Sequence, residues 1–97
     1  MKTLDEIKKT LRDNREAIGR EYKAEIVGIF GSCVRGEQKE ESDVDVLVRF
    51  RKGATLFDFV GFADFLEQKL GMKVDIASER AIRPELKERI LEEVVAV

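Results

Sequence analysis

The chain has 97 residues, enough for one domain with a small hydrophobic core. Its 18 basic and 20 acidic residues leave a formal net charge of −2, whereas a nucleic-acid-binding protein is expected to carry a strongly basic face. We therefore expect no nucleic-acid partner, and the charge balance disfavours a template-dependent polymerase.

Cysteine and histidine usage narrows the chemistry further. Cys33 has no second cysteine for an internal disulfide, and the absence of histidine excludes a Cys–His nucleophile, so we expect Cys33 to be a small packing residue. The N-terminus lacks the apolar segment of a signal peptide, and no apolar run approaches transmembrane length. We expect one domain over residues 1–97, located in the cytoplasm and without membrane contact.

The first expected element is a helix over residues 4–18. Its apolar residues recur at helical spacing: Leu4, Ile7, Leu11 and Ile18. Thr3 followed by Glu6 is a capping-box pattern, and Gly19 is expected to end the helix.

A short buried strand is expected next, over residues 26–30, which read Ile-Val-Gly-Ile-Phe. Gly31 and Ser32 follow it directly. Glycine lets the backbone approach a ligand closely, and the N–H groups of such a turn, together with the Ser32 hydroxyl, form a concavity suited to phosphate. Residues 37–41 then read as a polar loop.

Two acidic residues open the next strand, in the segment Ser42-Asp43-Val44-Asp45-Val46-Leu47-Val48. Residues two apart on a strand share a face, so Asp43 and Asp45 point to one side while the alternate valines point into a core. Like charges side by side repel, and folding alone does not require them. A site for Mg²⁺ beside a bound triphosphate does require such a pair, because Mg²⁺ typically binds one or two carboxylates plus phosphates. A solvated strand edge is the alternative, which the following Val-Leu-Val run disfavours.

A turn at residues 51–53 leads to a helix from Thr55 to about Leu70, ended by Gly71. One broad apolar stripe is expected to face the core: Leu56, Phe59, Val60, Phe62, Ala63, Leu66 and Leu70. Phe57 and Phe65 fall outside this stripe. We interpret them first as ordinary surface residues and, alternatively, as a surface for a partner.

A third strand is expected over residues 73–77, with Val74 and Ile76 toward the core and Asp75 on the opposite face. Asp75 is then either part of a functional site or an exposed strand acid.

A last helix is expected to begin at Pro84, which suits a first helical turn. Leu86, Ile90 and Val94 line one of its sides and are expected to cover the core, before an apolar tail at residues 94–97. The fold class predicted is α/β: a two-layer domain with a small mixed sheet, helices on one face, and the acid-bearing face open.

Three motifs together resemble the signature of the nucleotidyltransferase superfamily of DNA polymerase β type: Gly31-Ser32, Arg35-Gly36 and Ser42-Asp43-Val44-Asp45. The chain is most similar to the smallest members, the minimal nucleotidyltransferases (MNT) of HEPN–MNT toxin–antitoxin pairs. The resemblance runs from the strand at Ile26 to the final helix. Cys33-Val34 departs from the aromatic or small residue followed by alanine that many members carry.

The resemblance implies a polymerase β-like nucleotidyltransferase fold and an Mg²⁺-dependent protein adenylyltransferase that uses ATP. Asp43 and Asp45 would hold one Mg²⁺ ion or two, and the Gly31-Ser32 turn would bind the β- and γ-phosphates. The family's sheet layout would bring Asp75 to the same face, as a further metal ligand or as general base on the incoming hydroxyl. Arg35 would either contact phosphate or have an outward structural role.

The function implied is transfer of AMP to a hydroxyl, expected to be a tyrosine, of a partner HEPN toxin, in a type VII toxin–antitoxin system. The chain is too short for an acceptor-binding domain, so the partner would bring that surface and form a hetero-oligomer with it. Two alternatives stay open: an antitoxin that acts by binding and occlusion alone, and a small-molecule nucleotidyltransferase of the aminoglycoside type.

Overall fold

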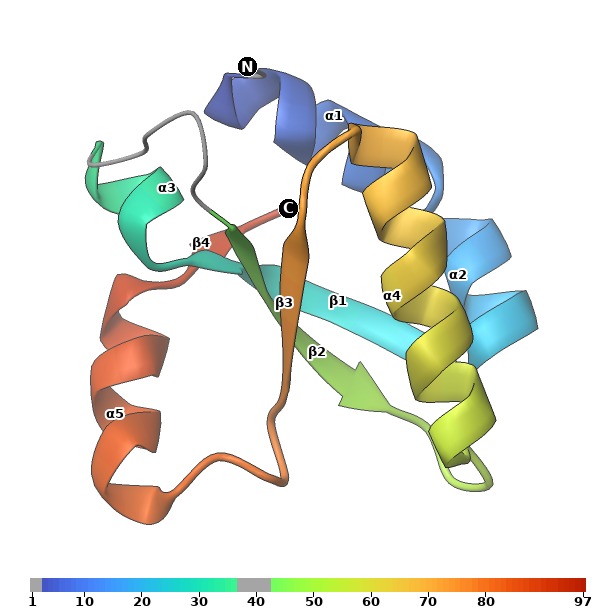
Figure 1. Ribbon diagram of the computed structural model, residues 1–97. Coiled ribbons are helices and arrows are strands. Elements are labelled where there is room, and N and C mark those ends of the chain that lie inside the picture. Colours follow the sequence, from blue (N-terminus) through green and yellow to red (C-terminus); the bar gives the residue numbers. More distant parts are fainter. Residues whose placement is uncertain (1–2, 37–42) are drawn as a thin grey trace.

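The computed structural model describes residues 3–36 and 43–97 (Figure 1). The elements follow in this order: α1 (Leu4–Asp13), α2 (Arg15–Tyr22), β1 (Ala24–Phe30), α3 (Ser32–Arg35), β2 (Val44–Phe50), α4 (Leu56–Leu70), β3 (Val74–Ser78), α5 (Pro84–Glu93) and β4 (Val95–Ala96). The polar loop expected at 37–41, together with Ser42, lies outside the described residues. Within the described ranges, no helix is both long and apolar enough to cross a membrane.

The four strands form one sheet in the order β3-β2-β1-β4. The sheet is mixed, as predicted. β1 is antiparallel to both β2 and β4, whereas β2 and β3 are parallel, joined by a crossover through α4. Helices α1, α2 and α4 pack together with the sheet (Figure 1). Their shared core contains fully buried side chains from both layers: Ile7, Leu11, Ile18, Phe62 and Leu66 from the helices, and Ile29, Val44, Val46 and Val48 from the strands.

The N-terminal helix is interrupted, and the prediction of one helix over 4–18 was wrong at Asn14. The Asn14 side-chain amide donates to the Thr10 carbonyl at 2.7 Å, so the side chain competes with the backbone for a helical acceptor. The start was predicted correctly, because the Thr3 hydroxyl accepts a hydrogen bond from the Glu6 N–H.

Gly19 does not end a helix, contrary to the prediction. It is buried inside α2, which continues to Tyr22 and ends at Lys23 in the left-handed conformation. A Cβ at Gly19 would lie 3.1 Å from Nη2 of Arg51, whose Nη1 donates to the Gly19 carbonyl at 3.4 Å. This glycine therefore serves the close approach of an arginine.

Helix α4 has the predicted ends, with a capping box at Thr55 and Gly71 in the left-handed conformation. The predicted apolar stripe was only partly right. Its fully or almost fully buried members are Phe62, Leu66 and Leu70, whereas Leu56 and Val60 are exposed. The first turn of α4 begins beyond the end of β2, and the helix packs against α1, α2 and β3 (Figure 1).

The two aromatic residues outside the stripe behave differently. Phe57 is 88% exposed. Phe65 is partly buried, with its ring centroid 5.5 Å from that of Tyr22, so its interpretation as a surface residue was wrong. Of these two aromatic residues, only Phe57 remains a candidate for a partner surface.

Helix α5 begins at Pro84 as predicted but does not cover the core. None of its residues is buried, and Leu86 and Leu91 are 46% and 42% exposed. α5 lies apart from α1, α2 and α4, on the other side of the strands in Figure 1. The apolar tail after it forms the short strand β4, which was not expected.

β1 contains a bulge between Ile26 and Gly28, where one extra residue interrupts the pairing with β2. Ile26 pairs with Val48, and Gly28 pairs with Leu47. As a result Gly28 and Phe30 share the face of Asp45, and the turn after Phe30 begins on the acid-bearing side of the sheet.

Candidate functional site

The turn after β1 is built so that only glycine fits at position 31. Gly31 has φ 82° and ψ −154°, a region that is essentially restricted to glycine. A Cβ there would lie 2.9 Å from Cγ of Asp45 and closer still to Oδ2. The Asp45 carboxyl group therefore rests directly against the backbone of this turn.

A single helical turn, α3, starts immediately after Gly31. The Gly31 carbonyl accepts hydrogen bonds from Val34 N–H at 3.1 Å and Arg35 N–H at 3.2 Å. The first N–H groups of a helix, here those of Ser32 and Cys33, have no acceptor inside the helix. These N–H groups belong to the same turn whose backbone the Asp45 carboxyl group contacts, and such groups are suited to binding phosphate.

Three acidic residues come together on the open face. Asp45 is the register partner of Asp75 in the parallel pair β2–β3, and Asp43 lies just before β2. Burial, then the charges of Asp75 and Asp43, raise the pKa of Asp45 to about 6. The sequence-based expectation that Asp75 would share the face of the other two acids agrees with this register.

The carboxylates of this site suit Mg²⁺ as one or two ligands beside phosphates and not as a complete coordination shell. Within residues 3–36 and 43–97, no three acidic, cysteine or histidine side chains are grouped so as to hold a metal ion. Mg²⁺ commonly takes one or two carboxylates and completes its shell with phosphates and water. The uncompensated charge at Asp45 fits such a cation, and the metal roles of Asp43, Asp45 and Asp75 stay predictions.

Glu93 belongs to the same region, and no sequence pattern singled it out. Its Oε1 accepts from Nη1 of Arg35, across 58 positions in the chain. The Glu93 charge also adds to the raised pKa of Asp45, whereas the Arg35 charge lowers it. Because the two residues meet only through tertiary structure, spacing along the sequence carried no signal for the pair.

Cys33 is buried behind the turn, as expected of a packing residue. Burial, with a further contribution from Asp45, raises the pKa of its thiol, which keeps the group protonated. A protonated, buried thiol is a poor nucleophile, so Cys33 is not a candidate for covalent catalysis.

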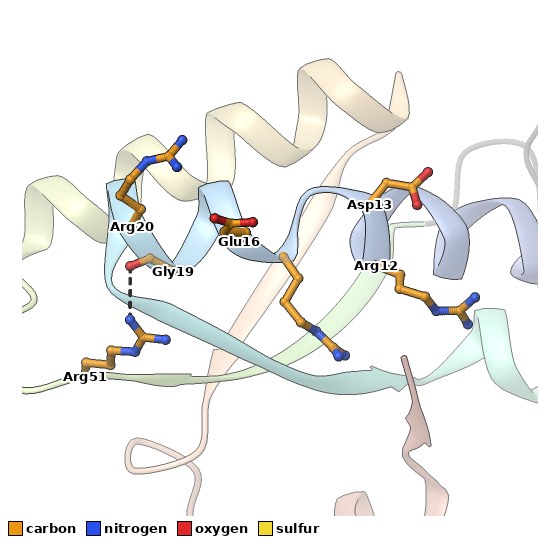
Figure 2. A pocket seen from close by; sticks show the side chains of 7 residues that line it. Arg12, Asp13, Glu16, Gly19, Arg20 and Arg51 are labelled. Atoms are coloured by element: carbon orange, nitrogen blue, oxygen red, sulfur yellow. Dashed lines mark hydrogen bonds between the residues drawn. The ribbon is translucent and has the colours of Figure 1, made fainter.

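Away from the acids, a hollow of about 600 Å³ lies beside α1 and α2 and is shown in Figure 2. Its lining includes Arg12, Arg20 and Arg51, with Glu16 among them. Arg20 and Arg12 lie at opposite ends of the view, and Arg51 is tied to the Gly19 carbonyl. The guanidinium groups do not converge on one point, so we assign no anion site here.

The chain belongs to the nucleotidyltransferase domain family, whose model matches residues 4–97. Among its relatives it is similar to the protein adenylyltransferase MntA of Thermococcus cleftensis, with 37% identity over 97 residues, covering all of this chain and 98% of the relative. The resemblance inferred from the Gly-Ser and Asp-x-Asp motifs is thereby confirmed at the level of family.

Solved structures confirm the fold. One described provisionally as a minimal nucleotidyltransferase has a TM-score of 0.76 and 43% identity, covering 92% of this chain and 94% of the other. A toxin–antitoxin structure with AMP-PNP has a TM-score of 0.68 and 25% identity, covering 95% of this chain and 69% of the other. One chain in the structure of a tri-AMPylated Shewanella oneidensis HEPN toxin in complex with an MNT antitoxin shares the fold, with a TM-score of 0.59, 22% identity, and coverage of 95% and 66%.

Proposed function

We propose that this chain transfers AMP from ATP to a hydroxyl of a partner HEPN toxin, with tyrosine as the acceptor, and so acts as the antitoxin of a type VII pair. The observation that carries the proposal is the contact between Asp45 and the glycine-only turn at Gly31, with Asp75 in register beside it. This arrangement places carboxylates next to a backbone suited to phosphate, which is what nucleotidyl transfer needs.

In the proposed reaction the acceptor oxygen attacks the α-phosphorus of ATP. The bond from the α-phosphorus to the α,β-bridging oxygen breaks, and pyrophosphate leaves. Gly31 and Ser32 hold the β- and γ-phosphates, and Arg35 offsets part of their charge. Asp75, which is exposed beside Asp45, accepts the proton of the incoming hydroxyl.

Asp43 and Asp45 are the residues that would hold Mg²⁺. When bound, the ion neutralises charge on the phosphates and on the two carboxylates. Asp75 as an additional ligand, and a second ion, belong to the same proposal.

The similarity to MntA and to a toxin–antitoxin structure with AMP-PNP supports a protein acceptor. The test is incubation with a purified HEPN toxin and ATP, with and without Mg²⁺, read by intact mass. The expected product is a toxin heavier by one or more AMP units, and fragmentation locates the modified residue.

Two other results would redirect the assignment. Full inhibition of the toxin by an Asp43→Asn, Asp45→Asn double variant, with no mass added by the unaltered chain, would support occlusion. Faster transfer to an aminoglycoside than to any protein would support a small-molecule enzyme.

A further inference from the structure

The C-terminal segment forms part of the wall around the candidate site. α5 ends at Glu93, and the next residues, Val95 and Ala96, pair with Ile29 and Gly28 of β1. Gly28 is two residues before Phe30, the strand residue that precedes the phosphate-type turn. β4 therefore fixes the end of α5 next to the start of α3.

The close packing of this segment depends on a glycine. A Cβ on Gly28 would lie 2.7 Å from Cγ2 of Val94 and closer still to the carbonyl oxygen of Val95. Gly28 is opposite Leu47 in the sheet, on the acid-bearing face. The segment that carries Glu93 is thus seated on the same face as Asp45.

Glu93 is placed to orient Arg35. Its side chain is 20% exposed and bonds Nη1 of Arg35, whose side chain is 46% exposed. A guanidinium group has five N–H donors, so an arginine that is held by a carboxylate can also donate to phosphate oxygens. Arg35 also borders a hollow of about 310 Å³ lined by Arg89, Glu92 and Glu93, which offers it other positions if the bond is lost.

We infer that Glu93 is a positioning residue for the nucleotide: it holds Arg35 in the direction from which the guanidinium meets the β- and γ-phosphates. The inference rests on the proposed function, since it requires a triphosphate at the Gly31 turn. Holding a long side chain in place before binding reduces the entropy lost when the ligand arrives. The role is carried by the accepting oxygen rather than by the negative charge, because a charge there repels phosphate.

Two substitutions separate these contributions. Glu93→Gln keeps an oxygen that accepts from Arg35 and removes the charge, whereas Glu93→Ala removes both. Calorimetry with Mg²⁺ and ATP is expected to give a dissociation constant about fivefold higher for Glu93→Ala than for Glu93→Gln, a modest ratio because the ion pair is partly exposed. Steady-state transfer should show the same ratio in KM for ATP, with kcat unchanged at saturating ATP.

Matched controls come from this chain. Arg49–Glu79 is a second ion pair with similar side-chain exposure, 57% and 20%, on β2 and just after β3. Glu79→Ala should leave ATP affinity within about twofold of the original, as expected for an ordinary surface pair. Glu92→Ala tests the effect of removing an acid from the same hollow and should behave likewise.

An Arg35→Ala background provides the decisive comparison. If Glu93 acts through Arg35, the difference between Glu93→Ala and Glu93→Gln disappears in that background. Equal affinities of the two Glu93 variants with Arg35 present, or a ratio that persists without Arg35, would overturn the positioning role. Absence of ATP binding by the unaltered chain would instead remove the proposed function, and the positioning role with it. Melting temperatures within a few degrees across the set show that folding is preserved.

Discussion

The two faces of β2 follow opposite rules. On one face Val44, Val46 and Val48 are fully buried against the helices and stabilise the fold. On the other, Leu47 is also fully buried, but Asp45 is placed beside Asp75 and has a pKa raised to about 6, an arrangement that costs stability whenever the carboxylate is charged. A strand of seven residues thus carries the core on one side and a site with unbalanced charge on the other. Substitutions on each face should therefore separate stability from activity.

The largest effect on activity is expected from Asp45→Asn. Loss of one of the two carboxylates proposed to bind metal should lower AMP transfer at least about a hundredfold, or about 2.7 kcal/mol. Mass spectrometry of the partner measures the loss. Transfer at the original rate would exclude Asp45 from the site.

The same variant should be more stable than the original protein at neutral pH without Mg²⁺. The folded-state pKa of Asp45 is above its unfolded value of 3.8, so the folded state binds more protons between pH 3.8 and about 6. The stability contributed by Asp45 is present below pH 3.8 and is lost as pH rises through 6. Thermal melts should show a gain for Asp45→Asn above pH 6 that disappears below pH 4. A gain that does not depend on pH would contradict this explanation.

Gly31→Ala is expected to have the next largest effect. It forces a side chain into a backbone region that favours glycine and against the Asp45 carboxyl, at a cost of about 2 kcal/mol. Both ATP affinity and unfolding free energy should fall. Gly71→Ala is the control, because Gly71 also has a positive φ but no neighbour within 4 Å of a built Cβ. Equal losses in the two variants would mean that backbone strain alone is responsible.

Val46→Ala tests the buried face. Removing two methyl groups from a fully buried side chain should lower the free energy of unfolding by about 2 kcal/mol, measured by urea denaturation. ATP affinity should stay within experimental error where the variant is folded. A large loss of ATP affinity in the folded variant would show that the two faces of β2 are not separable.

Phe57→Asp should have the smallest effect on stability, below about 0.5 kcal/mol, because the ring is almost fully exposed. If Phe57 contacts a protein partner, transfer to that partner should weaken while ATP binding is unchanged. Phe65→Asp would not be a clean test of docking, since Phe65 packs against Tyr22. Unchanged transfer by Phe57→Asp would mean that the partner docks on another surface. The exposed Leu86 and Leu91 of α5 would then be the next residues to substitute.

Local sequence signals were sufficient for the start of α1, for both ends of α4 and for the acid-bearing strand. Thr55 and Gly71 act through bonds and backbone angles within a few residues, and alternation alone places Asp43 and Asp45 on one face. Burial was harder to predict, because periodicity shows which residues share a side and not whether anything covers it. This is why the stripe on α4 was only partly right and the core role of α5 was wrong.

Contacts between residues far apart in the sequence could not be predicted from the sequence pattern. Glu93 reaches Arg35 only after β4 has paired with β1, and a strand of two residues is too short to produce a recognisable alternation. The helix breaks at Asn14, where the side-chain amide donates to the Thr10 carbonyl, although the apolar residues keep helical spacing on both sides of the break. In each case the deciding contact is a specific bond rather than a preference of residue type.

The bulge in β1 has a consequence for insertions and deletions. The extra residue between Ile26 and Gly28 interrupts the ladder and shifts the alternation of β1, so that Ile26 and Ile29 both lie opposite core-facing valines of β2. Deleting Val27 would turn the bulged pair into a regular one and keep Ile26 opposite Val48 and Gly28 opposite Leu47. What such a shortened chain would lose is the local bend and added twist that a bulge provides. The deletion therefore tests how the bend of β1 affects the position of Gly31, because the cross-strand neighbours on either side of the bulge are retained.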